Sequence, residues 1–206
     1  GVNLEEFKRL VEDQIKNINA DFNTTSAVLA LAGPMASGKN YVCSIFEQFG
    51  WHSIDADLLV HEAIKKAAPQ IIETFQPFES QFNVKITNTD GSINRRALGV
   101  ILFARPNLLA KQEAIVYPII TSMIQDFIAT HDKSIINATV LYKSPDLLQL
   151  CQAIIYVRAP WLTRLKRGRR RDLLPLKQII KRFLSQRHLL KKYQNTNLPI
   201  ILINNK

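Results

Sequence analysis

A short glycine-containing segment has the residue types and spacing of a loop that binds phosphate groups. Gly33, Gly38 and Lys39 fit the pattern Gly-x-x-x-x-Gly-Lys, between an apolar run and a helical pattern. Glycines let successive backbone N–H groups converge on phosphate oxygens, a helix N-terminus adds partial positive charge, and the lysine reaches the β- and γ-phosphates of a nucleotide. We therefore predict a nucleotide-binding P-loop; the alternative is a glycine-rich turn with an incidental lysine.

The residue after the loop lysine bears on the metal that accompanies a nucleotide. This position normally holds Ser or Thr, whose hydroxyl ligates magnesium, and here it is Asn40. The amide oxygen of Asn40 is a neutral oxygen donor of suitable hardness for magnesium. The sequence therefore predicts Mg²⁺ with ATP as the phosphoryl donor, and Asn40 as the metal ligand.

Two carboxylates follow the second apolar run, at Asp55 and Asp57, where a helical pattern begins. Ligands of open α/β sheets bind at the carboxyl ends of the strands. A carboxylate there can accept the proton of a hydroxyl that attacks phosphorus, and we assign this role to Asp57, while Asp55 is expected to cap the helix. His61 lies one helical turn after Asp57 and faces the same side, where it either contacts acceptor phosphates or is an ordinary polar helix residue.

A dense basic segment follows the fourth apolar run. Six basic side chains occupy eight positions without an acidic residue: Arg164, Lys166, Arg167, Arg169, Arg170 and Arg171. A lid that closes over transferring phosphates and a nucleic-acid patch are the competing functional interpretations, and a solvated helix face is the structural one. The phosphate loop favours the lid, because a planar guanidinium grips two phosphate oxygens at once. The arginines that do not contact phosphate are expected only to keep the surface soluble.

The elements that position these residues form an α/β pattern. Five apolar runs of strand length alternate with helical patterns and span 27–31, 52–54, 134–141, 153–157 and 200–203. Near-continuous apolar strands alternating with helices predict a parallel sheet covered on both faces. Between residues 58 and 130 the sequence shows four helical patterns, at 58–68, 71–78, 95–103 and 108–128. This is more helix than one connection between parallel strands needs, and we predict an inserted helical subdomain.

Composition narrows the class of protein. The chain has 206 residues, of which 47% are hydrophobic, and a net charge of +10, which suggests an acidic partner. Cys43 and Cys151 are far apart and show no metal-ligand spacing, so neither a disulfide framework nor a zinc site is expected, and a cytoplasmic location fits. The apolar runs are much shorter than the roughly 20 residues of a membrane span. We predict no membrane partner.

With further motifs, the chain resembles the dephospho-CoA kinase family over about residues 27 to 205. The family's Asp-Ala-Asp after the second strand stands at 55–57, and its Asp-Gly-Ser, Arg, Ala-Leu-Gly and Phe pattern at 90–103. Glu113 to Pro118 is similar to the next family motif. Residues at the spacing of the family's lid are Ala159, Pro160, Arg167, Arg171, Asp172, Arg182 and Gln186, and Ile203-Asn204 resembles its closing strand.

The resemblance implies a fold, a reaction and site residues. The fold is an α/β P-loop kinase with a parallel five-stranded sheet flanked by helices, an inserted helical acceptor-binding subdomain and a basic lid. The implied division is a core at 26–57, 131–163 and 194–206, an acceptor subdomain at 58–130, and a lid at 164–193. The stretch 1–25 lies outside the resemblance, and its apolar residues at helical spacing predict an amphipathic N-terminal helix. The implied reaction transfers the γ-phosphate of ATP to the ribose 3′-hydroxyl of dephospho-CoA, the last step of CoA synthesis.

The resemblance also assigns residues to roles. The segment around the ATP phosphates comprises Gly33 and residues Met35, Ala36, Ser37, Gly38, Lys39 and Asn40. The implied catalytic residues are Lys39, Asp57, Arg167 and Arg171, with Asp57 as the base for the 3′-hydroxyl. The acceptor is assigned to Asp57, His61, Arg95 and Tyr117. The small-molecule partners are ATP and dephospho-CoA, nucleic acid is not expected, and the sequence makes no prediction of oligomeric state.

Several positions depart from the family pattern. Asn40 replaces Ser or Thr, Asn137 replaces an acidic residue at the end of the third strand, Tyr117 replaces His, and a Glu near Lys143 is missing. Two other hypotheses therefore stay open. One is a different small-molecule P-loop kinase, which would lack the 90–103 pattern; the other is a non-catalytic nucleotide or nucleic-acid binder, which Asn40, Asn137 and the charge of +10 support.

Overall fold

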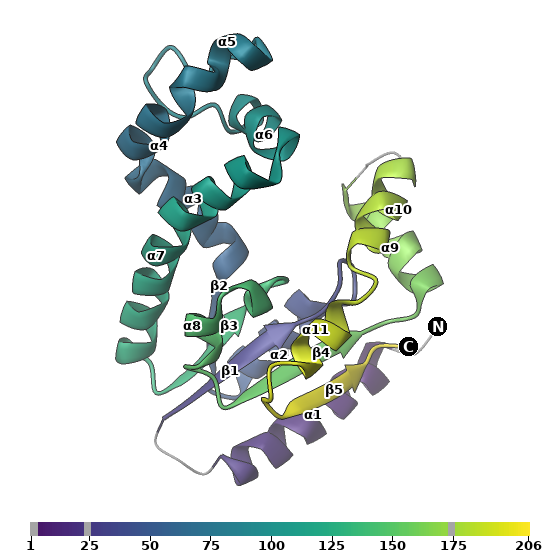
Figure 1. Ribbon diagram of the computed structural model, residues 1–206. Helices are drawn as coiled ribbons and strands as arrows, with labels where there is room; N and C mark the ends of the chain where they lie inside the picture. Colours follow the sequence, from purple (N-terminus) through teal and green to yellow (C-terminus); the bar gives the residue numbers. More distant parts are fainter. Residues whose placement is uncertain (1–3, 23–25, 173–175) are drawn as a thin grey trace. The chain divides into compact units, whose positions relative to one another are not determined.

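Five parallel strands form one sheet, in the order β2-β3-β1-β4-β5 (Figure 1). The computed structural model describes residues 4–22, 26–172 and 176–206. The strands are β1 (Ala27–Ala32), β2 (His52–Asp55), β3 (Lys133–Asn137), β4 (Ala153–Arg158) and β5 (Ile200–Asn204). All six residues of β1 and the first five of β4 are buried, as expected for strands covered on both faces. The predicted parallel five-stranded α/β sheet is confirmed.

The third strand ends earlier than predicted. It stops at Asn137, and the chain enters a 3₁₀ turn at Leu141–Lys143 (η2), so the predicted strand 134–141 is four residues too long. Ala138 still donates its N–H to the Leu31 carbonyl, and the Leu141 N–H turns instead to the Tyr193 hydroxyl at 2.9 Å. Leu141 is therefore buried outside the sheet, where its backbone is bonded to this tyrosine.

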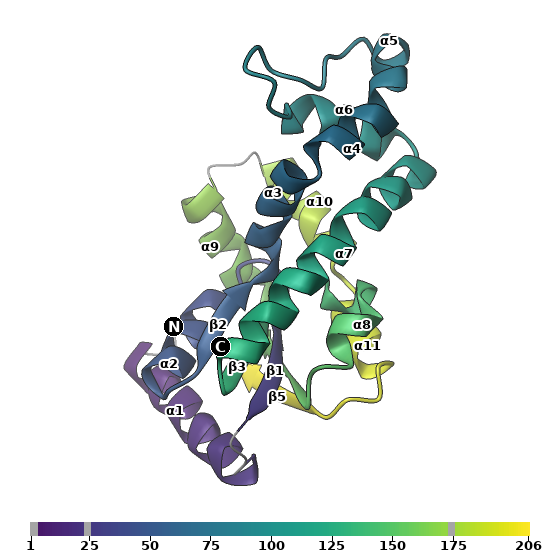
Figure 2. The same cartoon turned by 90° about the vertical axis from the view of Figure 1, so that its left-hand side faces the viewer.

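Helices cover the two faces of the sheet (Figure 2). On one side lie α1 (Leu4–Asp21) and α2 (Lys39–Gln48), and on the other lie α8 (Pro145–Leu148) and α11 (Leu189–Gln194). The basic segment forms α9 (Trp161–Asp172) and α10 (Leu176–Ser185) after β4. No helix in the described part of the chain is both long and apolar enough to cross a bilayer.

The first helix is part of the hydrophobic core. Its buried side chains, Phe7, Val11, Ile15 and Ile18, recur at helical spacing and join the cluster that contains α2 and the sheet. Asn19 accepts a hydrogen bond of 3.0 Å from the Trp51 indole, which fixes the end of α1 to the start of β2. The predicted amphipathic helix within 1–25 therefore packs onto the helix that follows the phosphate loop.

The chain folds into two compact units, residues 1–55 with 126–206, and residues 56–125. The second unit contains α3 (Ala56–Lys66), α4 (Ala68–Phe75), η1 (Gln76–Phe78), α5 (Glu79–Phe82), α6 (Arg95–Ala104) and most of α7 (Pro106–Thr130). The helix predicted at 71–78 begins three residues earlier, because Pro69 fits the first turn of a helix, where its missing N–H leaves no bond unmade.

Candidate active site

The glycine loop joins β1 to α2 through backbone conformations that glycine favours. Gly38 has φ +95° and lies at the N-cap of α2, and Ala36 has φ +61°. A Cβ at Gly38 would collide with the Asn205 amide, and one at Gly33 would collide with the Val157 carbonyl oxygen. Both glycines are therefore needed for close approach of neighbouring elements, and the loop leads directly into the first turn of α2, whose N–H groups have no intrahelical acceptors.

The loop lysine lies at the carboxyl edge of the sheet. Lys39 is half-buried, and its Nζ donates to the Thr139 Oγ1 at 3.1 Å, just beyond β3. Ligands of open parallel sheets bind at this edge. The ammonium group is thereby held near the loop, where it can neutralise the charge of a bound phosphate group.

An asparagine and an arginine brace the loop from the C-terminal part of the chain. The Asn205 Nδ2 donates to the Ser37 carbonyl oxygen at 2.9 Å, and the Arg167 Nη2 donates to the Asn205 Oδ1 at 3.3 Å. The Arg167 Nη1 is buried without a partner among the described residues. The structure thus brings Arg167 to the loop. Arg171, also predicted for the lid, lies in α9, and its side chain is outside the described part of the structure.

Both sides of the Met35 peptide are held by the basic segment. The Met35 N–H donates to the Gln186 Oε1 at 2.8 Å, and its carbonyl oxygen accepts from the Arg164 Nε at 2.9 Å. The Arg164 guanidinium also lies 4.2 Å from the centre of the Phe183 ring. The expectation that Arg164 only keeps the surface soluble is wrong, because tertiary contacts with the loop and α10 bury it by half. The sequence analysis did not use Gly168, one turn later on α9 and buried beside Met35, although a glycine within a basic helix is a signal that could have indicated this packed face.

A cavity of about 440 Å³ opens beside these contacts. Its lining includes Pro34 of the loop, Tyr156 and Arg164, together with the aromatic rings of Trp161 and Phe183. Burial raises the pKa of the Tyr156 phenol to about 12, so this group is a neutral hydrogen-bond donor at physiological pH. Burial also lowers the pKa of Arg164, although not enough to remove its charge. The cavity therefore combines flat apolar surfaces with three arginines, Arg158, Arg164 and Arg187, of which Arg164 is half-buried.

Two asparagines meet where the metal ligands of a P-loop site are expected. The Asn137 Nδ2 donates to the Asn40 Oδ1 at 3.1 Å. The Asn137 Oδ1 is buried and has no hydrogen-bond partner among the described residues. Amide oxygens are acceptable ligands for a hard cation such as Mg²⁺. The residues present thus fit the predicted metal, although no group of three or more His, Cys, Asp or Glu side chains gathers as a metal site in the described ranges.

The residues predicted for the acceptor lie in the second unit. Asp57 is exposed in the first turn of α3, and Arg95 at the start of α6 contacts the His61 imidazole through its Nη1. A cavity of about 340 Å³ is lined by His61, Ile64, Lys65, Ala68, Ser92, Ile93 and Arg95. Asn94 caps α6 by accepting from the Ala97 N–H at 3.1 Å, and Arg95 is the first residue of this helix. The structure therefore brings His61 and Arg95 together.

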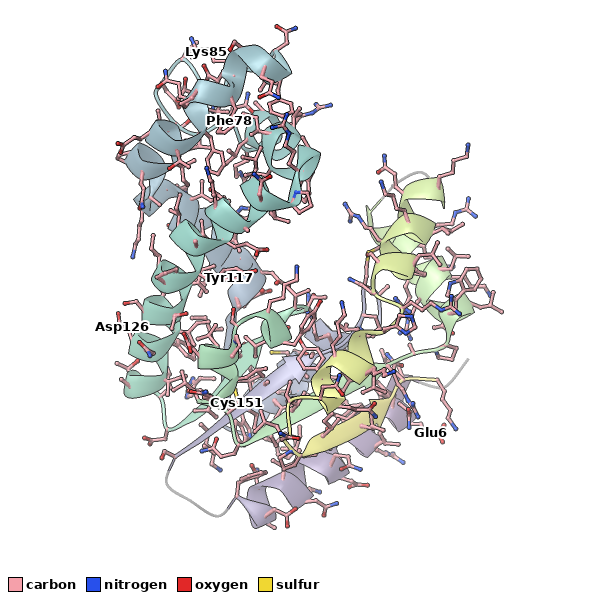
Figure 3. All side chains as sticks on the ribbon, viewed as in Figure 1. Glu6, Phe78, Lys85, Tyr117, Asp126 and Cys151 are labelled. Atoms are coloured by element: carbon pink, nitrogen blue, oxygen red, sulfur yellow. The ribbon has the colours of Figure 1, made fainter. Side chains whose placement is uncertain are left out.

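Tyr117 occupies a different part of this unit. It is half-buried on α7 (Figure 3) and is not among the residues that line the cavity.

The Asp90-Gly91-Ser92 turn lies close to the cavity, because Ser92 lines it. Hydrogen bonds from the Ser92 hydroxyl and N–H hold the pKa of the Asp90 carboxyl below its usual range, so the turn is ordered by an ionised side chain.

Sheet order and loop placement together define the class of protein. A glycine loop between a central parallel strand and its following helix, with a lysine at the first helical position, is the arrangement of a P-loop kinase. Two solved structures share the fold. TT1252 from Thermus thermophilus has a TM-score of 0.72 at 19% identity, with 89% of this chain and 90% of that chain covered. A dephospho-CoA kinase from Campylobacter jejuni has a TM-score of 0.57 at 24% identity, with the same coverage.

The family follows from the sequence comparison. The dephospho-CoA kinase family model matches residues 27–206, and the chain belongs to this family. A dephospho-CoA kinase from Treponema denticola is 32% identical over 184 residues, which cover 86% of this chain and 82% of that protein. The corresponding protein of Treponema pallidum is 28% identical over 165 residues and 78% of each chain. Helix α1 lies outside the family match.

Proposed function

We propose that this protein transfers the γ-phosphoryl group of ATP to the ribose 3′-hydroxyl of dephospho-CoA, giving ADP and CoA. The observation that carries the proposal is the phosphate loop, held on both sides by side chains of the basic segment at the carboxyl edge of the sheet. Membership of the dephospho-CoA kinase family supports the acceptor. The 90–103 pattern and the basic cavity beside it favour this acceptor over that of another small-molecule P-loop kinase.

The donor side is assigned to the first unit. The loop from Met35 to Asn40 and the N-terminus of α2 surround the phosphates, and Lys39 neutralises charge between the β- and γ-phosphates. Arg167 has a buried Nη1 with no protein acceptor among the described residues, which suits contact with a phosphate oxygen. Arg171, which also belongs to α9, is assigned the same contact with phosphate. These cations stabilise the charge that develops on the oxygens as the phosphoryl group moves.

The acceptor side is assigned to the second unit. His61, Arg95 and Lys65 line one cavity, and their basic groups suit an acceptor that carries phosphates. Asp57 accepts the proton of the 3′-hydroxyl as its oxygen forms a bond to the γ-phosphorus and the bond to the β-phosphate bridging oxygen breaks. ADP leaves with the electrons of that bond. Tyr117 contributes to the acceptor side from α7.

Magnesium accompanies ATP in this proposal, and Asn40 supplies a protein oxygen for it. The cation would neutralise charge on the β- and γ-phosphates.

The location of the reaction is proposed to be the cytoplasm, because Cys43 and Cys151 are free thiols. Burial raises the pKa of both, that of Cys151 to about 12, so neither is an activated thiolate (Cys151 is marked in Figure 3).

The test is ADP formation with a panel of acceptors. The purified protein is incubated with Mg²⁺, ATP and either dephospho-CoA, pantetheine or a nucleoside, and CoA is identified by mass. We expect ADP and CoA in equal amounts with dephospho-CoA alone, and no turnover by a folded Lys39→Ala variant. Transfer to another acceptor would replace this function with that of another P-loop kinase. Absence of ATP turnover with all acceptors, together with tight and salt-sensitive binding to RNA or DNA, would favour a non-catalytic nucleic-acid binder.

A further inference from the structure

The paired asparagines at the metal position act as a unit. Asn40 is the second residue of α2, and Asn137 is the last residue of β3, 97 positions apart in the sequence. In P-loop NTPases these positions typically provide a hydroxyl ligand and a carboxylate, which together carry one negative charge. Here both positions hold neutral amides, and the two amides bond to each other at 3.1 Å. These two positions thus bring no charge to the site.

The geometry of the pair leaves oxygen acceptors for a ligand. A carbonyl oxygen has two lone pairs, and the Asn137 N–H uses one of those on the Asn40 Oδ1. The second lone pair stays available on an exposed side chain. The other amide oxygen, the Asn137 Oδ1, is buried in a residue that is only 5% exposed and has no hydrogen-bond partner among the described residues. A buried polar atom of this kind is usually satisfied by water or a ligand.

The sheet places the pair at the ligand-binding edge. Asn137 pairs in parallel register with Leu31 of β1 on one side and with Asp55 of β2 on the other. It therefore lies at the carboxyl end of the strand next to the one that leads into the phosphate loop. A purely structural amide would have both of its polar groups satisfied within the fold, and within the described ranges Asn137 has only its donor satisfied.

We propose that Asn40 and Asn137 form a neutral amide site for the divalent cation of a bound nucleotide. The Asn40 Oδ1 would be the ligand, and Asn137 is a positioning residue that orients it by donating to that oxygen and whose own buried Oδ1 would accept a further hydrogen bond at the site. Because the pair brings no charge, the cation binds with the nucleotide and not to the protein alone. The inference rests on the ATP-dependent function proposed above and adds how this chain holds the metal.

The test uses Mn²⁺ and ADP as probes. Free Mn²⁺ is measured by its paramagnetic resonance signal, with and without ADP, for the full chain and for Asn40→Ala, Asn137→Leu and the double variant. Changing a residue that orients a metal ligand commonly weakens metal affinity by about 10- to 100-fold. We expect a loss of about tenfold for each single variant in the ADP complex, with ADP affinity in EDTA unchanged. The double variant should lose less than the product of the two single losses, because one residue acts through the other.

Two further variants sharpen the result. Asn40→Asp still accepts from Asn137 and adds a charge, so it should bind Mn²⁺ without ADP, which the wild-type chain should not do. Ser134→Ala removes a buried hydroxyl from the opposite end of β3 and should leave Mn²⁺ affinity unchanged. If Asn137→Leu does not fold, Asn137→Ser replaces it, since serine is too short to reach Asn40.

The outcomes of these measurements test the amide site and the proposed kinase function separately. Wild-type Mn²⁺ affinity in folded ADP complexes of both Asn40→Ala and Asn137→Leu would overturn the amide site while leaving the kinase function intact. Binding of Mn²⁺ with ADP that depends on both residues, in a protein that forms no CoA, would support the site and reject the function. A chain that binds no ADP at all would overturn both.

Discussion

The Asn205 side chain donates a hydrogen bond of 2.9 Å to the Ser37 carbonyl oxygen, across 168 positions of sequence. This bond holds the phosphate loop against the residue that follows β5. A Cβ at the adjacent Gly38 would collide with the same amide, so the glycine and the asparagine are sterically matched. Arg167 completes the arrangement by donating to the Asn205 Oδ1. Loop shape and lid position are thereby coupled through one side chain.

Asn205→Ala should weaken ATP binding. Loss of the two amide hydrogen bonds frees the Ser37 peptide and the Arg167 side chain, so the loop must be ordered by the nucleotide. A net cost of about 1.4 kcal/mol, typical of one or two hydrogen bonds, corresponds to a tenfold higher Kd for ATP, which calorimetry can measure. Asn204→Ala is the matched control, because the Asn204 Oδ1 accepts from Arg158 and not from the loop. Equal Kd values for the two variants would contradict the bracing role of Asn205.

Arg164→Lys should raise the KM for ATP by about tenfold although it preserves the charge. Lysine is a point donor without a planar face, so it cannot both donate to the Met35 carbonyl and stack on Phe183 as the guanidinium does. The control is Arg169→Lys, an exposed position on the same helix, for which steady-state kinetics should show no change. If both variants kept the wild-type KM, the contact with Met35 would have no part in nucleotide binding.

These contacts show where sequence reasoning succeeds and where it stops. The sheet could be predicted because Leu29, Leu31 and Ile155 belong to apolar runs whose burial on both faces suits only a covered parallel sheet. The end of β3 could not, because Leu141 is as apolar as the strand and just as buried, while its N–H bonds to the hydroxyl of Tyr193, a residue distant in sequence. The hydrophobic pattern of a sequence predicts which residues are buried, but it does not predict which residues they contact.

The candidate site divides in the same way. Gly33, Gly38 and Lys39 were recognisable because the loop's chemistry depends on residues that are close in sequence. The Asn40–Asn137 bond and the Arg164–Met35 bond join residues 97 and 129 positions apart, so no local pattern contains them. The roles of Asp57 and Tyr117 stay predictions.

Ile15→Ala should destabilise the fold through α1. Ile15 is fully buried in the cluster shared with α2, and large-to-small changes of this kind cost about 2–5 kcal/mol. For a chain of this size we expect a Tm lower by roughly 5–15 °C in thermal unfolding. Leu10→Ala on the same helix is the control, because Leu10 is 44% exposed and should change Tm little. Similar Tm values for Ile15→Ala and the wild type would mean that α1 is not part of the cooperative core.

Asp57→Asn should lower kcat toward dephospho-CoA by roughly 10²-fold or more, the usual size of a general-base contribution, with little change in ATP affinity. The amide can hydrogen-bond to the 3′-hydroxyl but cannot accept its proton. If Asp57 only stabilised the start of α3, asparagine would substitute well, since the two residues cap helices about equally. The control is Glu62→Gln, which removes an exposed carboxylate from the same helix, where it pairs with Lys65. Rapid-quench kinetics should show a slow chemical step only in Asp57→Asn. A folded Asp57→Asn protein with the kcat of Glu62→Gln would leave Asp57 as a helix residue and require another base for the 3′-hydroxyl.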